Sequence, residues 1–351
     1  VMAITIQDQP STTYVRPAFA PIEYLLTSTN TAQTGFKIIC KVYFDPTGAN
    51  TLISTQQLNI KPLTTQAVFS VQDVVKSYVP ITYSIPEGDT VDLIENPLSD
   101  FKVTFQEYYD SALQGSAVAS DVIAAYAASP KYIQFASNEW QDYQVEDNII
   151  VQDKFLSGFD NIAASAVGLG ADNSWIKVKD TQKIQIQWIQ RAASLNVDIR
   201  FQTLDSSFTV ISTSILTLGL IPQNYFALDI GRQEVGSHTW DTPPVWTNAK
   251  YFNVALYYNS FSSPISNTYL YELDDCDTNY TNYELHWLNR WGGFDSFVFD
   301  GKSNQSTDIN KTFAKYATDR ISGSSLVYTT SAQRTRAFHT GTSESYTLNS
   351  R

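Results

Sequence analysis

The stretch from Tyr283 to Phe299 constrains the fold of this chain more than any other part of the sequence. It reads Tyr-Glu-Leu-His-Trp-Leu-Asn-Arg-Trp-Gly-Gly-Phe-Asp-Ser-Phe-Val-Phe. Apolar side chains alternate before and after the Gly-Gly pair, as they do in strands with one apolar face. Asparagine and glycine between the two runs tolerate the positive φ that lets a chain reverse tightly. We therefore predict an antiparallel hairpin that carries Tyr283, Leu285 and Trp287 on one face.

Composition extends the prediction of strands to the rest of the 351 residues. The chain has 21 Tyr and 19 Phe, and aromatic and β-branched residues suit the pleated surface of a sheet. Charged residues make up only 17%, against roughly 25% in ordinary soluble proteins. Ser, Thr and Asn take their place, which suits a surface that neighbouring molecules cover. We predict an all-β protein whose surface is used for association.

The order of apolar runs and turns predicts four regions. Residues 1–25 contain three prolines and are predicted to form an extended arm that frays or lies across a neighbour. Residues 26–100 are predicted to form a small β-sandwich with one short helix, and residues 101–299 a larger β-sandwich or jelly roll. Residues 300–351 are polar, and we predict a projecting β-hairpin extension whose outer face another chain completes.

Three local patterns sharpen this outline. Val71–Tyr78 has helical spacing of its apolar residues, so a short helix capped by Ser70 is predicted there. Ala117–Ala128 is rich in alanine and is compatible with either a short helix or a loop. Tyr132–Ala136 is predicted to be a strand. Tyr132–Ala136 is the first of the predicted strands that recur at regular intervals along the larger sandwich.

The segment Ile184-Gln-Ile-Gln-Trp-Ile-Gln190 predicts how one sheet of the larger sandwich is placed. Strand periodicity turns Ile184, Ile186 and Trp188 toward the core, while Gln185, Gln187 and Ile189 face outward. Such alternation is typical of an antiparallel sheet with one solvated face.

The net charge of −12 and the sequence pI near 4.6 exclude several partners. Nucleic acid and anionic membranes are recognised through lysine and arginine, so we expect neither as a partner. The sequence contains no run of 18 or more apolar residues, so we do not expect a membrane-spanning helix. The first eight residues lack the basic and apolar regions of a signal peptide.

Two cysteines, Cys40 and Cys276, are too few for a disulfide framework. Cys40 lies in an apolar strand, where a free cysteine behaves as a small hydrophobic residue. A disulfide between the two stays an alternative, but their number fits assembly in a reducing cytoplasm.

Residues that could carry chemistry are sparse. Asp274, Asp275 and Asp277 form an acidic cluster that suits either calcium or a solvated turn, without the spacing of an EF-hand. The three histidines have no zinc spacing, and no G-x-S-x-G motif supports a serine nucleophile. A polysaccharide-degrading enzyme would need two distant acidic residues that converge in the fold. We therefore predict no catalytic residues, no cofactor and no metal.

Four residues are the candidates for contact with a partner or ligand. Trp240 and Trp246 bracket Asp-Thr-Pro-Pro in an irregular loop, where exposed tryptophans can stack on sugars. His286 is placed by alternation on the exposed or interface face of its strand. Trp291 occupies the hairpin turn. Trp188, in contrast, is predicted to be a core residue.

Three stretches together resemble a virion structural protein of tailed bacteriophages that infect Bacteroidota, including crAss-like phages. They are Phe19-Ala-Pro-Ile-Glu-Tyr24 with the strand from Gly35-Phe36, Val68–Tyr78, and the region from Cys276 through Trp287-Leu-Asn-Arg-Trp-Gly-Gly-Phe-Asp to Gly301-Lys-Ser303. The third is the most distinctive. The chain departs from the family pattern at Trp291, where a smaller apolar residue is usual.

The resemblance implies a non-enzymatic component of the tail, baseplate or tail-fibre adaptor that assembles in several copies. Its partners would be copies of itself and other virion proteins, and its location the virion, assembled in the host cytoplasm. Strand addition at exposed sheet edges is the expected mechanism. The alternative is a carbohydrate- or receptor-binding module on a phage or cell surface, with a host surface glycan as ligand.

Overall fold

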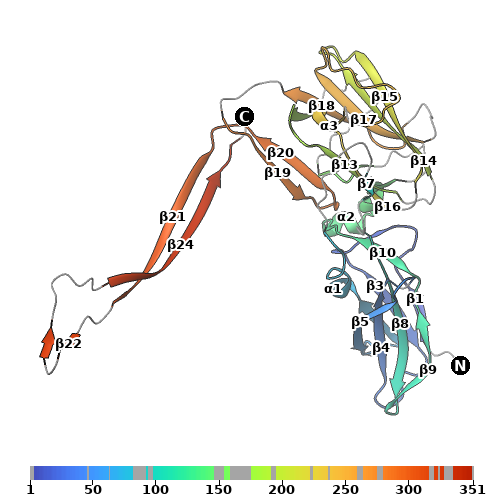
Figure 1. Ribbon diagram of the computed structural model, residues 1–351. Coiled ribbons are helices and arrows are strands. Elements are labelled where there is room, and N and C mark those ends of the chain that lie inside the picture. The colour runs from blue at the N-terminus through green and yellow to red at the C-terminus, as the bar shows by residue number, and fades with distance from the viewer. Residues whose placement is uncertain are drawn as a thin grey trace. The chain divides into compact units, whose positions relative to one another are not determined.

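A computed structural model provides the fold of the chain (Figure 1). It describes residues 4–349 apart from short gaps, and the statements below concern only the described residues. The gaps are 46, 63, 82–91, 94–97, 146–153, 159–174, 191–194, 222–223, 236–237, 259–263, 275–279, 316–319, 323–324 and 328–334.

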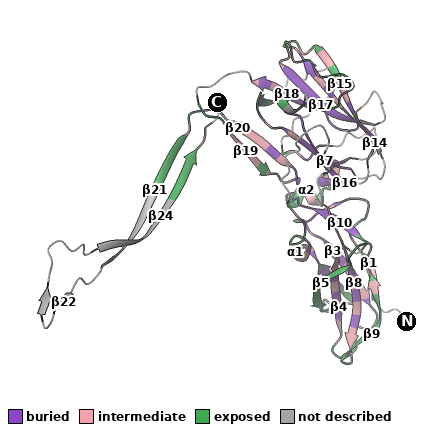
Figure 2. Cartoon of the chain, in the orientation of Figure 1, coloured by how far each residue is buried: buried purple, intermediate pink, exposed green. Residues whose placement is uncertain are grey.

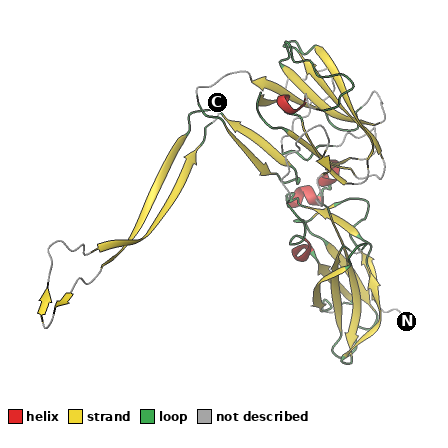
Figure 3. Ribbon diagram, in the orientation of Figure 1, coloured by secondary structure: helices red, strands yellow, loops and turns green. Residues whose placement is uncertain are grey.

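The described chain is nearly all β-strand, as Figure 3 shows, which confirms the predicted fold class. Contacts divide it into two compact units. Unit 1 comprises Val1–Asp275 and His286–Phe297, and unit 2 comprises Cys276–Leu285 and Val298–Arg351. Unit 1 holds two sandwich-like regions, and unit 2 holds a long two-stranded ribbon.

The first sandwich packs a three-stranded sheet on a larger one. The small sheet has the order β1-β3-β6, and the larger has the order β2-β10-β8-β4-β5 with β9 paired to β8. The strands are β1 (Ile4–Asp8), β2 (Arg16–Pro17), β3 (Glu23–Ser28), β4 (Lys37–Phe44), β5 (Thr51–Leu58), β6 (Gln66–Ser70), β8 (Ser99–Tyr109), β9 (Ala112–Ala119) and β10 (Ile123–Tyr126). Alternate residues of β4 and β8 are buried, so both strands turn one face to the core.

The core of this sandwich contains aromatic contacts between its two sheets. Tyr24 of β3 and Phe69 of β6 both lie against Phe105 of β8, with ring centroids 5.5 and 5.9 Å apart. Cys40 is a free, fully buried thiol in the same core, and burial raises its pKa to about 12. This agrees with a small hydrophobic role for Cys40 rather than a disulfide; Cys276 lies outside the described residues.

The prediction that residues 1–25 form an arm outside the fold is wrong. β1 pairs with β3 from Ile4 opposite Ser28, and β2 pairs in parallel with β10. Val15, Ala18 and Ile22 are almost completely buried. The prolines that indicated an arm separate short apolar stretches, and each stretch fills part of the sandwich core.

The predicted boundary at residue 100 is also wrong. β8 pairs with β4 along eight residues, from Lys37 opposite Tyr108 to Phe44 opposite Phe101, so it belongs to the first sandwich. The alanine-rich segment after it forms β9 and β10 rather than a helix or loop, because both strands pair with β8. The helix is shorter than predicted: α1 spans Gln72–Val75, and Val71 rather than Ser70 is its N-cap.

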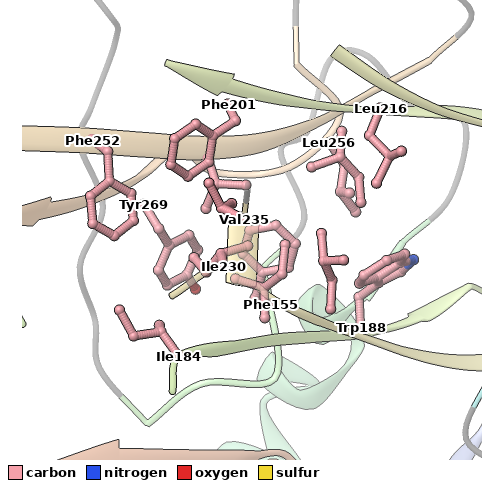
Figure 4. Close-up of a cluster of buried hydrophobic side chains, with 14 of the residues drawn as sticks. Phe155, Ile184, Trp188, Phe201, Leu216, Ile230, Val235, Phe252, Leu256 and Tyr269 are labelled. Carbon is pink, nitrogen blue, oxygen red and sulfur yellow. The ribbon is translucent and has the colours of Figure 1, made fainter. Parts of the chain in front are cut away.

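The second sandwich combines a four-stranded sheet with a five-stranded one. The first has the order β11-β13-β16-β7, and the second β12-β18-β17-β14-β15. The elements are β7 (Asp92–Leu93), β11 (Gln144–Val145), β12 (Ile176–Lys179), β13 (Gln185–Gln190), β14 (Leu195–Leu204), β15 (Val210–Ile221), β16 (Asn224–Asp229), α3 (Arg232–Val235), β17 (Tyr251–Tyr258) and β18 (Tyr269–Asp274). Figure 4 shows their core, where Trp188, Phe201 and Phe252 pack among aliphatic side chains.

The prediction that β13 has one solvated face is wrong. Ile186 and Trp188 face the sandwich core as expected, but Gln187 and Ile189 on the other face are 2% and 0% exposed. A second apolar cluster covers that face and includes Tyr126, Trp140, Tyr143 and Trp291.

Part of this cluster comes from the connection between the sandwiches. Tyr132–Ala136 forms the short helix α2 rather than the predicted strand, and the 3-10 helix η1 (Glu139–Tyr143) follows it. The backbone N–H of Lys131 donates to the side chain of Gln134, 3.2 Å away, at the start of α2. Phe135 of α2 stacks on Trp140 of η1, which anchors both helices to the cluster.

The predicted C-terminal hairpin is present in unit 2. β21 (Asn304–Lys315) pairs with β24 (Thr335–Thr347) through 12 residue pairs, with one irregularity beyond Thr312. A short pair of strands, β22 (Arg320–Ser322) and β23 (Ser325–Val327), lies between them in sequence. The described side chains of β21 and β24 are exposed (Figure 2).

Candidate functional site

The hairpin predicted at Tyr283–Phe299 is formed by β19 (Tyr283–Leu288) and β20 (Phe294–Phe299). Its turn, Asn289–Gly293, is largely buried. Trp291 is 0% exposed and stacks on Tyr143 with ring centroids 3.9 Å apart and an interplanar angle of 17°. The Arg290 guanidinium lies 4.9 Å from the Trp291 ring. The prediction that Trp291 contacts an external partner is wrong, because the connection between the sandwiches already covers it.

Two glycines let the turn approach its surroundings. Gly292 has φ of +88°, and a Cβ there would lie 2.7 Å from the carbonyl oxygen of Ala127. A Cβ on Gly293 would clash with the carbonyl oxygen of Leu156. Larger residues cannot occupy either position without moving the backbone, which gives the Gly-Gly pair a physical role.

Asn289 organises the turn through its side chain. Its Oδ1 accepts hydrogen bonds from the backbone N–H groups of Trp291 and Gly293, at 2.9 and 3.2 Å. Its Nδ2 donates to the carbonyl oxygen of Leu156 at 2.9 Å. The backbone N–H of Asn289 closes the turn by donating to the carbonyl oxygen of Gly293. One side chain thus satisfies three buried groups that water cannot reach.

Buried polar side chains of the four-stranded sheet complete the contact. The hydroxyl of Tyr225 lies 3.0 Å from the carbonyl oxygen of Gly292 and 3.0 Å from Oε1 of Gln187, and these two acceptors share its single proton. The same Gln187 oxygen accepts from the backbone N–H of Phe294. Burial raises the pKa of Tyr225, so its hydroxyl keeps its proton and acts as a donor.

Asp295 ends the motif as a buried carboxylate, 6% exposed. It accepts hydrogen bonds from the hydroxyl of Ser157 at 3.0 Å and from the backbone N–H of Gly158 at 2.9 Å. Burial raises the pKa of Asp295, and these donors lower it by less. A cavity of about 20 Å³ adjoins the carboxylate, which is room for one water molecule.

This arrangement is a structural joint rather than a substrate site. The Asp295 cavity is water-sized, far below the roughly 300 Å³ of a small ligand pocket. Asp295 accepts hydrogen bonds from residues 157 and 158 and so holds that segment in place. The glycines of the turn pack directly against neighbouring backbone. What the joint does is fix the hairpin against both sandwiches of unit 1.

The structure contradicts the prediction of an exposed Trp240. Trp240 is 7% exposed, and its indole N–H donates to the carbonyl oxygen of Val235. Trp246 is half-buried: Phe201 and Phe252 pack against it, and Arg232 lies 5.5 Å from its ring. The loop that carries both residues folds back onto the five-stranded sheet, so the Trp240 ring is covered and the Trp246 ring is only partly exposed.

The hairpin strands distribute their side chains differently from the turn. Leu285 and Trp287 of β19 are 45% and 41% exposed, because β19 and β20 form a sheet of only two strands. His286 lies on the opposite face and is partly buried. Burial, with a smaller contribution from Lys183, lowers its pKa. Alternation identified the apolar face of β19 but did not indicate that it would be exposed.

The acidic cluster is described only at Asp274. Its Oδ2 accepts a hydrogen bond from Nζ of Lys179 at 2.8 Å, across the parallel pair β12 and β18. Asp275 and Asp277 lie outside the described residues. Among the residues that the structure describes, no group of three or more His, Cys, Asp or Glu could hold a metal ion.

Sequence reasoning missed the polar residues that matter most to the joint. Gln187 was predicted to be solvated, and Gln144, which binds both the N–H and the carbonyl of Val15 at 2.9 and 2.6 Å, was not singled out. The sequence signal that Gln187 is buried is the presence of large apolar residues beside it, Ile186, Trp188 and Ile189.

Comparisons with known proteins identify no family. No family model matches the chain, and no curated protein matches it. Among solved structures, the calcium-binding domain CBD12 of CALX1.1 covers 78% of this chain and 100% of its own, with 6% identity and a TM-score of 0.24. The native conformation of E. coli alpha-2-macroglobulin covers 99% of this chain and 21% of its own, with 8% identity and a TM-score of 0.21.

TM-scores of this size reflect a common richness in β-strands and transfer no site or activity to this chain. Within the described residues, no helix is long and apolar enough to cross a membrane. What stands is an all-β chain with a buried joint and a two-stranded ribbon.

Proposed function

We propose that this protein is a non-enzymatic structural component of a tailed-phage virion, in the tail, baseplate or tail-fibre-adaptor region, and that it acts by multi-copy assembly. The observation that carries the proposal is the β21–β24 ribbon. It pairs 12 residues of each strand, yet no third strand joins its sheet among the described residues. A two-stranded ribbon is marginally stable in water, and a third strand or a covering surface is what makes such a sheet persist.

The composition of the ribbon supports association rather than repulsion. The sequences of its two strands contain two acidic residues, Asp308 and Glu344, and three basic ones, Lys311, Lys315 and Arg336. Their net charge is therefore only +1. Most other positions are Ser, Thr or Asn, which form cross-strand hydrogen bonds such as Ser306 to Ser345 at 2.6 Å. Copies of the ribbon can therefore pair edge to edge without a large electrostatic cost.

The resemblance of the Trp-Leu-Asn-Arg-Trp-Gly-Gly-Phe-Asp motif to a phage virion protein supplies the biological setting of the proposal. The residues of this motif have a structural role, because Asn289, Gly293 and Asp295 fix the turn of the hairpin within unit 1. The two strands of the hairpin lead directly into unit 2, which contains the ribbon. The joint thus anchors the base of an assembly element.

The mass of the particle in solution tests the proposal. Light scattering after size exclusion is expected to give a multiple of 39.3 kDa for the intact chain. A variant in which a short Gly-Ser linker replaces Asn304–Thr347 is expected to be monomeric, while Trp246→Ala keeps the mass of the intact chain. A monomeric intact chain, or an unchanged multiple after ribbon deletion, would contradict assembly through the ribbon. Detection of the chain in purified phage particles tests the virion location.

A carbohydrate- or receptor-binding role is the second candidate, and one observation favours it. Trp287 has 41% of its surface exposed on β19, unlike Trp240 and Trp291. Exposed indole rings stack on sugars. On a glycan array, this role predicts binding that Trp287→Ala abolishes and Trp246→Ala retains; an array without any bound glycan counts against it.

A further inference from the structure

The outer face of the six-stranded sheet carries an unusual group of lysines. Lys37 and Lys41 of β4 alternate with the buried Ile38, Cys40 and Val42, so both point away from the core. Lys102 of β8 is on the same outer face, opposite Tyr43 and next to Lys41 along the paired strands. These three residues are called the lysine face below.

The lysine face is not neutralised within the described residues. Lys37 donates to the side-chain oxygen of Gln57 at 3.2 Å, and Lys102 lies 5.8 Å from the Tyr43 ring, but none of the three lysines forms an ion pair there. Asp100, at the end of β8, is the acidic residue on the same outer face. Unit 1 as a whole has 16 Lys and Arg against 29 Asp and Glu. A basic face on so acidic a body indicates a partner of opposite charge.

Beside the lysine face lies an open sheet edge. β5 pairs with β4, and no second strand pairs with it in the described part of the chain. Its sequence, Thr-Leu-Ile-Ser-Thr-Gln-Gln-Leu, has no charged residue and no proline, the usual means by which edge strands prevent pairing. A bulge interrupts the pairing at Val42/Tyr43, but Ser54–Leu58 remain in regular register with β4.

Two other long edge strands of unit 1, β15 and β9, are each interrupted by side-chain hydrogen bonds. At β15, the backbone N–H of Ile215 donates to Oδ1 of Asp241, and the carbonyl of Ile215 accepts from the Asp241 N–H. At β9, Gly115 takes φ of +62° and its carbonyl accepts from the Gln106 side chain, which breaks the regular edge. For β5, no comparable hydrogen bond from a loop is present among the described residues.

We propose that β5 accepts an extended segment of a different protein that carries Asp or Glu at alternate positions. Added as the next strand, the segment would lie about 4.8 Å beyond β5. Acidic side chains opposite Thr55 and Gln57 would lie two strand spacings from β4, where the long side chains of Lys41 and Lys37 can meet them above β5; Lys102, one strand further, adds to the positive potential of the face. Backbone pairing supplies the register, and the three lysines select an acidic strand.

Charge decides against the other occupants. Pairing of β5 with β5 of a second copy would bring two lysine faces together, and β5 offers no acidic residue to compensate. The ribbon strands together hold two acidic and three basic residues, so they do not supply the acidic alternation either. Three lysines are few for nucleic acid, whose affinity grows with each phosphate neutralised. The occupant is therefore an acidic strand from another protein.

A labelled peptide tests the proposal directly. The probe alternates Glu with Val and Thr over eight residues, and its binding to the full chain is measured by fluorescence anisotropy. The matched probes replace Glu by Lys, or keep the Glu residues and place prolines between them. We expect only the first probe to bind, and hydrogen exchange to slow at the β5 amides when it does.

Charge reversal then assigns the surface. Lys41→Glu with Lys102→Glu is expected to weaken binding at least about tenfold, since each reversal removes an attraction and adds a repulsion. Lys131→Glu, at an exposed lysine outside both strands, is expected to change it less than about twofold. Equal binding of the proline probe, equal effects of both variants, unchanged exchange at β5, or stronger binding of a single-stranded oligonucleotide would overturn the proposal.

The proposal goes beyond assembly through the ribbon and fails separately from it. A chain that assembles through the ribbon but ignores the acidic probe refutes the β5 site alone. A monomeric chain that binds the probe refutes the ribbon's role alone.

Discussion

Two hairpins of this chain differ in sequence and in surroundings: β19–β20 is rich in aromatic residues, and β21–β24 is mostly polar. The β19–β20 turn buries Trp291 completely and has its backbone groups bound by Asn289, Gln187 and Tyr225. The β21–β24 ribbon pairs over a much longer distance, yet its described side chains are exposed. The short hairpin is held by its own chain, whereas we propose that the long one is held by other chains.

Hydrogen exchange should give the largest contrast between the two. In dilute, unassembled protein, the amides of β21 are expected to open at a cost near zero, because a lone ribbon is marginal. The amides of β13, under two buried faces, should open only with global unfolding, at roughly 5–15 kcal/mol. Exchange followed by mass spectrometry measures both in one experiment. Protection of β21 in a proven monomer would break the comparison.

Removing the Trp291 ring should be the most damaging point change. Trp291→Ala empties a fully buried site and removes the stacking on Tyr143, so we expect a loss of about 3–5 kcal/mol in the free energy of unfolding. Trp287→Ala, at a position 41% exposed, is the matched control and should cost less than about 1 kcal/mol. Urea denaturation followed by circular dichroism measures both. Similar losses would mean that the turn is not a joint.

The side chain of Asn289 comes next in size. Asn289→Ala leaves the N–H groups of Trp291 and Gly293 and the carbonyl of Leu156 without their partner, so we expect a loss of about 2–3 kcal/mol. Asn304→Ala, at an exposed ribbon position, should change stability by less than about 0.5 kcal/mol. Urea denaturation measures both variants. An unchanged free energy of unfolding for Asn289→Ala would mean that these hydrogen bonds do not stabilise the turn.

The smallest expected effect is on pH dependence. Burial raises the pKa of Asp295 in the folded chain above its usual value of 3.8. The folded state therefore holds this proton more tightly than the unfolded state does, and the resulting stabilisation is complete below the unfolded pKa. It is lost as pH rises through the folded pKa. Unfolding free energies of Asp295→Asn and of the intact chain should converge toward low pH and diverge above it; parallel profiles would contradict a raised pKa.

Sequence predicted most of the strands and failed where partners in the fold are distant. Alternation located β4, β13 and β17, since a core-facing strand shows its period locally. It misplaced residues 1–25 and the second face of β13, because their partners are distant in sequence: β2 pairs with β10, and Tyr143 and Trp291 cover β13. No local sequence pattern predicts the hydrogen bond between Gln144 and Val15 or the stacking of Tyr143 on Trp291.

The candidate contact residues failed for a related reason. A tryptophan in an irregular loop is exposed only if the loop stands away from the body, and Asp241 instead ties its loop to Ile215 of β15. Trp240 and Trp246 are buried and half-buried as a result. Open edges such as β5 are a property of sheet order, which sequence periodicity does not contain.

The hydrogen bonds between Val15 and Gln144 have a consequence for how the molecule is made. β1 and β2 cannot complete their sandwich until β10 has been synthesised, and the segment around Val15 is fixed only when Gln144 has emerged from the ribosome as well. Nascent chains should therefore stay protease-sensitive until residue 144 has emerged. For the same reason, deleting residues 1–25 would remove β1 and β2, one strand from each sheet of the first sandwich, and we expect the shortened protein to aggregate.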